Sequence, residues 1–473
     1  MMEKMLRRIR RFCSLRRNVD DDRSPLGRST PDKDRPFHIN NMQLRQFLEQ
    51  HLGGRVDIEE EHVTPQQAGD PVPCTFQIQV TVRTNSKTLL TLNLFVKMLM
   101  DDQDDLPKIE RAYMRLDELI NMKKVVQTYN VVIPKIGMFQ EQMKIQKHFL
   151  ISNLFPECVG ARMSLQPRLL YLPDQSSAIM LYNPCEQCTF DAWELEGCRY
   201  NGFRYNTSVL ILRDMARFHA GTIAMRLKGN TTFEREIIPI VSLEVKRFKK
   251  IPPFETLSHE LISHGLRDVQ LPDDQIVAIR ESLHLYRLDD WIIRAGRDQT
   301  WYALSYSRYC NPYIMSSQTR SNATKTSKLL ELHRSGFNNC CEDLASFIFT
   351  CVNPEIFELR FAIFQMFENL LEEYYYEFNR TLQVHKIPID QYTYHGFTSE
   401  FHAVGKKMLA HIFESIKSCF CENYNRDGDP ILSNEYSKRI KATVNIMTMY
   451  KWIKHSDSNF SDVSTDRNLL LLS

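Results

Sequence analysis

The chain has 473 residues, 43% of them hydrophobic and 25% charged, enough for one large two-lobed core or two to three ordinary domains. Its 60 Lys and Arg balance 58 Asp and Glu, so the overall charge gives no case for a nucleic-acid partner or a membrane surface. No stretch approaches the roughly 18 uninterrupted apolar residues of a spanning helix. The first 20 residues carry seven Lys or Arg, so we expect neither a transmembrane segment nor a secretory signal.

The twelve cysteines are scattered along the chain, which indicates a reducing compartment and predicts a cytoplasmic protein. Cys185 and Cys188 form a CxxC pair, and Cys340 and Cys341 are adjacent. Zinc sites need a second spaced pair with partner histidines, which does not follow here. We therefore expect structural thiols at these positions.

Residues 1–36 are rich in Arg, Ser, Asp and Pro, which predicts a disordered basic arm, and residues 456–473 predict a disordered tail. Within the arm, apolar residues fall three apart, as in a short amphipathic helix. That spacing leaves open a mitochondrial presequence or a membrane-surface anchor. The apolar residues are Leu6, Ile9, Phe12 and Leu15.

A β-rich region begins with "TFQIQVTV", where strict alternation predicts a strand with one apolar face. The turn sequence "TNSK" follows, and "LLTLNLFVKML" continues as a second strand of a β-hairpin. Lys97 near the end of this second strand points to the face opposite Leu90, Leu92, Leu94 and Val96. We expect the hairpin to pack those apolar side chains on a core.

Helical patterns follow at 101–130 and 137–154, with two further strands at 168–172 and 178–182. From residue 206 the pattern is mostly helical, and "NTS" is typical of an N-cap for the first of these helices. Strands return near 301–333. The expected order is a β-rich lobe over 37–183, with a helical insertion at 101–130, and a helical lobe over 184–455. Two-lobed phosphotransferases have this layout. The later helices are expected at 233–248, 255–265, 274–296, 357–378 and 401–416.

The segment "MARFHAGTIAMRL" (215–227) resembles the "LAxFHA" helix of the insect ecdysteroid-kinase-like family, also called choline-kinase-like. That family belongs to the aminoglycoside phosphotransferase branch of the protein-kinase-like superfamily, and the resemblance covers nearly all of residues 60–420. It implies an α+β, two-lobed protein-kinase-like fold with a small β-rich N-lobe and a larger, mainly helical C-lobe. It also implies ATP and magnesium as cofactors and a nucleotide or small-molecule ligand. His219 is expected to be a core or cleft-structuring residue.

The resemblance implies a nucleotide-binding set in the N-lobe. Lys97 in "LFVKML" is similar to the strand lysine that pairs with nucleotide phosphates, as a mobile point charge can. Its carboxylate partner is expected to be Glu141 in "MFQEQM", with Glu110 in "IERAY" as the alternative. Gly69 lies in the phosphate-covering loop "TPQQAGDPVPC", whose prolines remove backbone N–H donors.

The segment "SYSRYCNP" resembles the family's catalytic loop, whose pattern is His-Gly-Asp followed after four residues by Asn. Ser305 stands at the His, Tyr306 at the Gly, Ser307 at the Asp and Pro312 at the metal-binding Asn. A serine has neither the charge nor the basicity of the carboxylate that accepts the substrate proton. Asn311, one position earlier, compensates only if the loop shifts register.

Downstream, "KLLELHRSG" resembles the family's Asp-Phe-Gln segment and puts Glu331 at the metal-binding Asp, while Asp343 is expected to be structural. The missing base and ligand predict a pseudokinase that can still bind a nucleotide or small molecule. One alternative is an active kinase that transfers phosphate from ATP to a hydroxyl of a lipophilic substrate such as an ecdysteroid. Another is a pure interaction protein with a vestigial cleft.

Overall fold

A computed structural model gives the arrangement of most of the chain. The residues it describes are 41–65, 74–99, 108–165, 172–174, 176–182, 202–243, 266, 271–285, 299–306, 314–317, 326–329, 335–357, 360–424, 430–432 and 434–453. Among these residues, no helix is both long and apolar enough to cross a bilayer.

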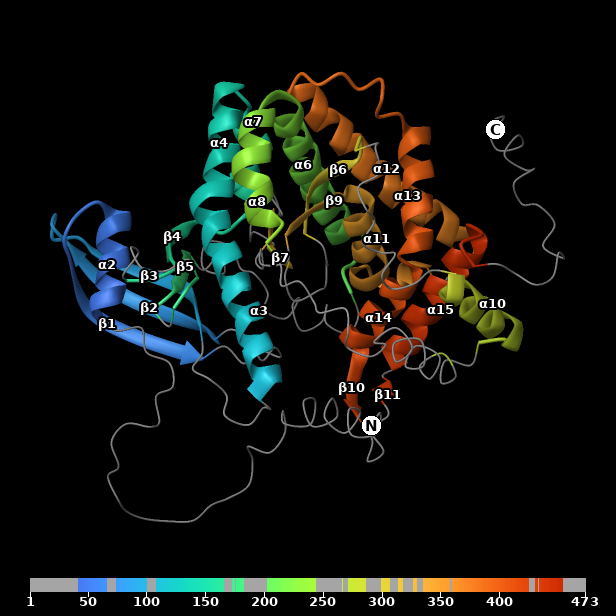
Figure 1. Ribbon diagram of the computed structural model, residues 1–473, viewed down its shortest axis with the longest axis horizontal. Coiled ribbons are helices and arrows are strands. Elements are labelled where there is room, and N and C mark those ends of the chain that lie inside the picture. Colours follow the sequence, from blue (N-terminus) through green and yellow to red (C-terminus); the bar gives the residue numbers. More distant parts are fainter. Residues whose placement is uncertain are drawn as a thin grey trace, which may run out of the picture.

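The N-terminal lobe is an antiparallel sheet of five strands in the order β1-β2-β3-β5-β4. A helix, α2 (Asn41–Leu52), precedes the sheet and covers one of its faces (Figure 1). The strands are β1 (Val56–Pro65), β2 (Cys74–Thr84), β3 (Leu89–Met98), β4 (Cys158–Arg162) and β5 (Ala178–Tyr182).

The core of this lobe follows from the alternation along the strands. Leu92, Leu94 and Val96 of β3 are buried, and the residues between them are partly exposed. The buried face packs against apolar side chains of α2, including Phe47. A Cβ on Gly160 would lie 2.2 Å from the ring of Phe47, so only glycine lets α2 approach β4 this closely.

One long helical rod stands between the sheet and the helical lobe (Figure 1). It runs without a break through α3 (Lys108–Gln127), a π-helical segment η1 (Thr128–Val132) and α4 (Ile133–Gln142). We predicted one helix over 137–154, and that was wrong. The chain leaves the helix through Lys144, whose φ of 56° is left-handed, and continues as two 3₁₀ turns. These are η2 (Lys147–Phe149) and η3 (Ile151–Leu154).

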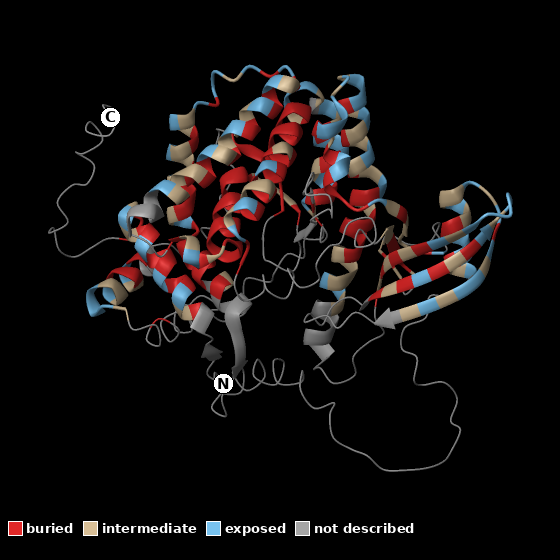
Figure 2. Cartoon of the chain, turned by 180° about the vertical axis from the view of Figure 1, so that it is seen from behind, coloured by how far each residue is buried: buried red, intermediate tan, exposed pale blue. Residues whose placement is uncertain are grey.

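The helical lobe is built around the buried pair α6 (Tyr205–Lys228) and α12 (Arg360–Val384), and Figure 2 shows the buried residues concentrated in its central helices. Both helices contribute apolar side chains to the larger of the two hydrophobic cores, together with α11 and α14. The other helical segments are α7 (Asn230–Thr232), η4 (Phe233–Ile237), α8 (Ile238–Val241), α10 (Asp273–Leu285), α11 (Cys340–Cys351), η8 (Pro354–Phe357), α13 (Tyr394–Lys407), α14 (Leu409–Phe420) and α15 (Asn434–Met449).

Short strands are inserted into the helical lobe as antiparallel pairs. β6 pairs with β9, β7 pairs with β8, and β10 pairs with β11. β6, β7 and β8 lie within the range 301–333 in which strands were predicted. Their bounds are β6 (Tyr302–Ser305), β7 (Ile314–Ser317), β8 (Thr326–Leu329), β9 (Gly336–Asn339), β10 (Cys421–Tyr424) and β11 (Pro430–Leu432).

The α+β, two-lobed arrangement, the β2–β3 hairpin and the strand at 178–182 are confirmed. The sequence patterns missed α2, β1 and β4. The predicted "NTS" cap was wrong, because α6 already begins at Tyr205 after the extended residue Arg204, and Ser208 lies inside the helix with its hydroxyl donating to Phe203 O at 3.1 Å. The strand expected at 168–172 and the helix expected at 255–265 lie almost wholly outside the described residues.

Candidate functional site

The end of β6 is the part of the predicted catalytic loop that the structure describes. Ser305, the last residue of the strand, is fully buried and lies opposite Gly336 at the start of β9. Its hydroxyl oxygen accepts a hydrogen bond from the side-chain amide of Asn338 at 2.9 Å. The chain therefore enters the loop from a strand end that is fixed by both backbone pairing and a side-chain contact.

A buried carboxylate fixes the first residue of the loop. The backbone N–H of Tyr306 donates to Oδ2 of Asp343 at 2.5 Å, and Asp343 is fully buried in the first turn of α11. The side chain of Tyr306 is also fully buried, although the family pattern has a glycine at this position. Asp343 is thus a structural residue, as its position in "CEDLASFIF" predicted.

His219 completes this network from the middle of α6. Its Nε2 lies 3.1 Å from Oδ2 of Asp343, and its Nδ1 lies 2.8 Å from the hydroxyl of Tyr374 on α12. A neutral imidazole satisfies both contacts if Nε2–H donates to the carboxylate and Nδ1 accepts from the tyrosine. Burial raises the pKa of Tyr374 well above its usual value, which keeps that hydroxyl a donor. His219 is therefore a buried core residue with two polar partners, one of the two roles predicted for it.

The sequence "NCCE" explains why α11 begins where it does. Asn339 is the N-cap, and its side-chain oxygen accepts from the backbone N–H of Cys341 at 3.0 Å. Glu342, three residues after the cap, interacts with the backbone N–H of Asn339, which completes a capping box. Burial, reinforced by the neighbouring Asp343, raises the pKa of Glu342 to about 8. The side chain is therefore largely protonated at neutral pH.

A second buried carboxylate positions β8, the strand that leads toward Glu331. The hydroxyl of Ser327 donates to Oδ2 of Asp214 on α6 at 2.5 Å, and Arg217 lies 3.0 Å from the other oxygen. Burial raises the pKa of Asp214 despite these partners. The long helix α6 therefore supports two of the short strands. His219 reaches the residue after β6 through Asp343 of α11, and Asp214 binds Ser327 of β8 directly.

Lys97 lies on β3 with the orientation that the alternation predicted. It is partly exposed on the sheet face opposite the buried Val96, and it is paired across the sheet with Thr75 on β2 and Ile179 on β5. The same row continues from Ile179 to Ala161 on β4. The carbonyl of Ala161 accepts from the side chain of Asn130 at 2.9 Å, so the row of Lys97 reaches the rod at η1.

The structure does not bring Glu141 to this row. Glu141 is exposed in the last turn of α4, eleven residues beyond Asn130, which is about 16 Å along a helix axis. No ion pair joins Glu141 to another residue that the structure describes, Lys97 included. Glu110 lies in the first turn of α3, at the far end of the rod. Between Glu118 and Glu141 the rod carries no carboxylate.

The other predicted site residues lie outside the described parts of the chain. Gly69 falls between β1 and β2, Ser307 follows Tyr306 directly, and Glu331 falls between β8 and β9. Asn311 and Pro312 also belong to this undescribed set, as do Cys185 and Cys188. Ser305 pairs with Gly336, so the end of β6 and the start of β9 lie side by side.

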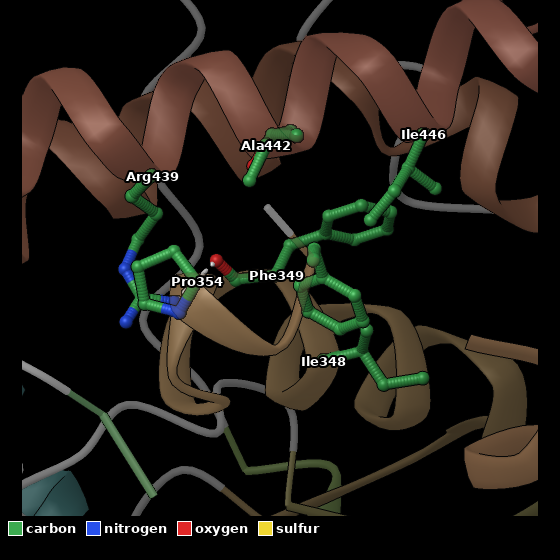
Figure 3. Close-up of a pocket in the computed structure, with 8 residues that line it drawn as sticks. Ile348, Phe349, Pro354, Arg439, Ala442 and Ile446 are labelled. Atoms are coloured by element: carbon green, nitrogen blue, oxygen red, sulfur yellow. Dashed lines mark hydrogen bonds between the residues drawn. The ribbon is translucent and has the colours of Figure 1, made fainter. Parts of the chain in front are cut away.

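One small hollow among the described residues lies away from this strand end. Figure 3 shows it between α11, η8 and α15, lined by Ile348, Phe349, Ala442 and Ile446, with an empty volume of about 180 Å³. Arg439 reaches along it and donates to the backbone carbonyls of Phe349 and Val352 at 3.2 and 2.7 Å. The guanidinium thus caps the C-terminal end of α11, so the hollow is a packing gap beside a helix cap.

The strand pairs, the anchored loop start and the lysine-bearing sheet together have the arrangement that the sequence resemblance predicted. The model of the ecdysteroid kinase-like family matches residues 74–387, about two thirds of the chain. The chain belongs to this family. A comparison with curated proteins gave no match.

Ecdysteroid kinase-like proteins have a kinase-like fold that uses ATP and magnesium, so the donor set of this member can be compared with the ion. Near the end of β6, the described residues supply neutral oxygens and Asp343, whose Oδ2 is engaged by Tyr306 and His219. Magnesium prefers carboxylate oxygens in near-octahedral geometry. No group of three or more His, Cys, Asp or Glu residues that could hold a metal occurs in the described chain. The described side chains near the end of β6 therefore do not fit a magnesium ion.

Proposed function

We propose that this ecdysteroid kinase-like protein is a pseudokinase that has kept the scaffold of its family's site but cannot transfer phosphate. What supports the proposal is the residue that follows the anchored strand end. The contacts of Tyr306 with Asp343 hold the start of the loop, and the next residue is Ser307 where the family has its aspartate. A serine hydroxyl cannot accept the substrate proton at neutral pH.

The neighbouring carboxylate cannot replace the missing base. Asp343 is fully buried, and one of its oxygens accepts from both Tyr306 and His219. A general base must come within about 3 Å of the substrate hydroxyl, either directly or through one water. Because Asp343 lies beneath the loop, moving it toward a substrate would leave a buried backbone N–H and an imidazole N–H without an acceptor. That loss opposes the movement.

We propose further that a nucleotide or small-molecule ligand still binds beside Lys97. The side chain is partly exposed on the sheet face away from the core, as a phosphate-contacting lysine must be.

The first test is a phosphotransfer assay with MgATP and a panel of lipophilic alcohols, including an ecdysteroid. We expect no turnover by the wild-type chain above that of the Lys97→Ala variant. The doubly restored variant Ser307→Asp, Pro312→Asn should gain measurable turnover if the missing groups alone limit the reaction. Wild-type turnover that is abolished by Lys97→Ala and by Glu331→Gln would overturn the proposal and establish the active-kinase alternative.

Thermal unfolding separates ligand binding from catalysis. A ligand at 100 times its Kd stabilises the folded state by about 2.7 kcal/mol, which raises the Tm by several degrees. We expect ATP at millimolar concentration to raise the Tm of the wild-type chain but not that of Lys97→Ala. The matched control is Lys87→Ala, in the exposed turn of the same hairpin. No shift with any nucleotide or alcohol in the panel would favour an interaction protein with a vestigial cleft.

A further inference from the structure

The end of α4 is joined to the end of α12 by a buried amide–imidazole contact. Gln140 and His385 are both fully buried, and Nε2 of Gln140 lies 3.1 Å from Nε2 of His385. The same amide nitrogen donates to the carbonyl of Phe149 at 3.1 Å, and its oxygen accepts from the backbone N–H of Ile151 at 2.9 Å. One side chain therefore holds the segment after α4 and the residue after α12 together.

These contacts determine the state of the imidazole. Nδ1 of His385 lies 2.8 Å from the carbonyl of Thr381, which can only accept, so Nδ1 carries a proton. Nε2 faces the amide nitrogen of Gln140, which can only donate, so Nε2 must present its lone pair. The imidazole is thus neutral, with its proton on Nδ1. Rotating the amide of Gln140 does not help, because its oxygen would then leave the N–H of Ile151.

A second proton on His385 would break this arrangement. Protonated Nε2 would point an N–H at the amide N–H of Gln140, and a charge would be buried against the stacked ring of Phe139, 6.2 Å away. Burial lowers the pKa of His385, and Lys228 at the end of α6 lowers it further, while the contact with Thr381 O acts in the opposite direction. The contribution to stability is therefore complete above the unfolded-state pKa of about 6.5 and is lost as the pH falls through the lower folded-state value.

We propose that the Gln140–His385 contact is a pH-sensitive joint, which holds the segment between α4 and β4 to the helical lobe while the imidazole is neutral. Protonation releases the N–H of Ile151 and the carbonyl of Phe149 from Gln140. This segment is the stretch of chain that leads from the rod to β4, the edge strand of the sheet that carries Lys97. Loosening it changes how firmly the two lobes are joined, independently of whether the site binds or transfers phosphate.

Part of the segment stays attached on either side of the transition. Ile151 packs on Gly221 of α6 so closely that a Cβ there would lie 2.5 Å from its side chain. Lys328 on β8 donates to the carbonyls of Asn153 and Phe155 at 2.5 and 3.3 Å. The release is therefore local, and it is confined to the residues that Gln140 holds.

Hydrogen exchange by mass spectrometry tests the joint on the full chain. The reporter is the protection factor, corrected for the intrinsic pH dependence, of a peptide that covers residues 147–155 and includes the Ile151 amide. A peptide that covers the β2–β3 turn is the control, because its Thr84 amide donates to the backbone carbonyl of Thr88 at 3.0 Å, which does not titrate. Between pH 7.5 and 5.5, we expect the first protection factor to fall by up to about tenfold and the second to stay constant.

Two variants make the test specific. His385→Gln places an amide oxygen near the former Nε2 and cannot titrate, so its protection should not depend on pH. His395→Gln, in an exposed part of α13, should behave as the wild type does. If His385→Gln fails to fold, Lys228→Gln serves instead, because removing the nearby cation should move the wild-type midpoint to higher pH. An unchanged wild-type protection factor, an equal fall in His385→Gln, or a midpoint that moves to lower pH in Lys228→Gln would refute the joint.

Discussion

Asp343 shows how one buried carboxylate can support a site without taking part in its chemistry. Its Oδ2 accepts from the N–H of Tyr306 and from the imidazole of His219, and these partners come from β6 and α6. Each contact fills a donor that would otherwise be buried without an acceptor. Asp343 therefore serves as a buried acceptor that holds the residue after β6 and the middle of α6 together.

Replacing Asp343 with alanine should therefore destabilise the protein by about 2–5 kcal/mol, because two buried donors lose their acceptor. Urea unfolding of the purified variant measures this loss. The control is Asp57→Ala on β1, where the side chain is 68% exposed and 4.0 Å from Arg45. That change should stay within about 0.5 kcal/mol. Equal effects at the two positions would show that Asp343 does not hold the loop start.

Glu342, beside Asp343, should make the folded state less stable as the pH rises. A carboxylate whose pKa is lowered by a partner has the opposite effect. The folded-state pKa of Glu342, about 8, lies above the ordinary value, so its contribution is complete below about pH 4.5 and is lost as the pH rises to 8. Glu342→Gln keeps a side chain that fits the capping box but never ionises. Relative to wild type, the variant should gain on the order of 3 kcal/mol between pH 5 and pH 8.5 in urea unfolding. A pH-independent difference would contradict the buried, protonated state.

At this scale the sequence predicted some roles and could not predict others. The residue types at 305, 306 and 343 could be placed by resemblance, and the structural role of Asp343 was predicted from its motif. The partners of Asp343 could not be predicted, because His219 and Tyr306 lie 124 and 37 residues away in the chain. The joint between Gln140 and His385 spans 245 residues and left no local pattern at all.

Among the elements, the close packing of α13 against the C-terminal segment depends on a glycine. Trp452 follows α15 and is buried against Gly405, and its indole N–H donates to Nδ1 of His402 at 3.1 Å. A Cβ on Gly405 would lie 2.1 Å from the indole ring. The ring therefore occupies space that any other residue at this position on α13 would fill.

Gly405→Ala should expel the indole and destabilise the fold by about 1–3 kcal/mol, with a red shift in tryptophan fluorescence as the ring meets water. The matched control is Gly137→Ala in α4, where nothing lies within 4 Å of the added methyl group. That change should be neutral or stabilising by up to about 1 kcal/mol, since alanine is the better helix former. Thermal unfolding and fluorescence of the two variants measure the difference, and the same response in both would argue against this packing.

Regular periodicity was the reliable signal for elements. The alternation in "TFQIQVTV" and "LLTLNLFVKML" predicted β2 and β3, and the apolar spacing after residue 206 predicted α6. β1 was missed because "VDIEEEHV" is an edge strand with charged residues on both faces, as edge strands often are. The end of α4 was misplaced because the apolar spacing continues through η2 and η3, which bury Phe149 and Ile151 as a helix would.

On the scale of the whole molecule, the rod from Lys108 to Gln142 belongs more to the helical lobe than to the sheet. Its middle touches β4 through Asn130, and polar side chains along it also bind the helical lobe. Lys124 donates to the carbonyl of Leu243, and Lys135 pairs with Glu236 at 2.9 Å. Gln140 adds the contact with His385. The sheet and α2 are thus the part of the chain best placed to move as a unit.

The lobes themselves could be predicted from composition along the chain, because strands cluster before residue 183 and helices after it. The sequence could not predict how the rod divides its contacts between the lobes. The rod was expected to provide the acidic partner of Lys97 through Glu141, but Glu141 lies exposed at the end of α4 and forms no ion pair with the described residues. The alternative partner, Glu110, stays a prediction.

The buried network around His219 also constrains how the protein is made. The histidine is synthesised 124 residues before Asp343 and 155 residues before Tyr374. At cellular translation rates, His219 therefore waits roughly 6–25 s on the ribosome before Asp343, the nearer of its two polar partners in the chain, is synthesised. The β1–β3 sheet, whose pairings are local, can assemble during this delay. The helical lobe acquires its core only near the end of synthesis, so a chain that terminates early exposes the apolar surface of α6 to chaperones and proteases.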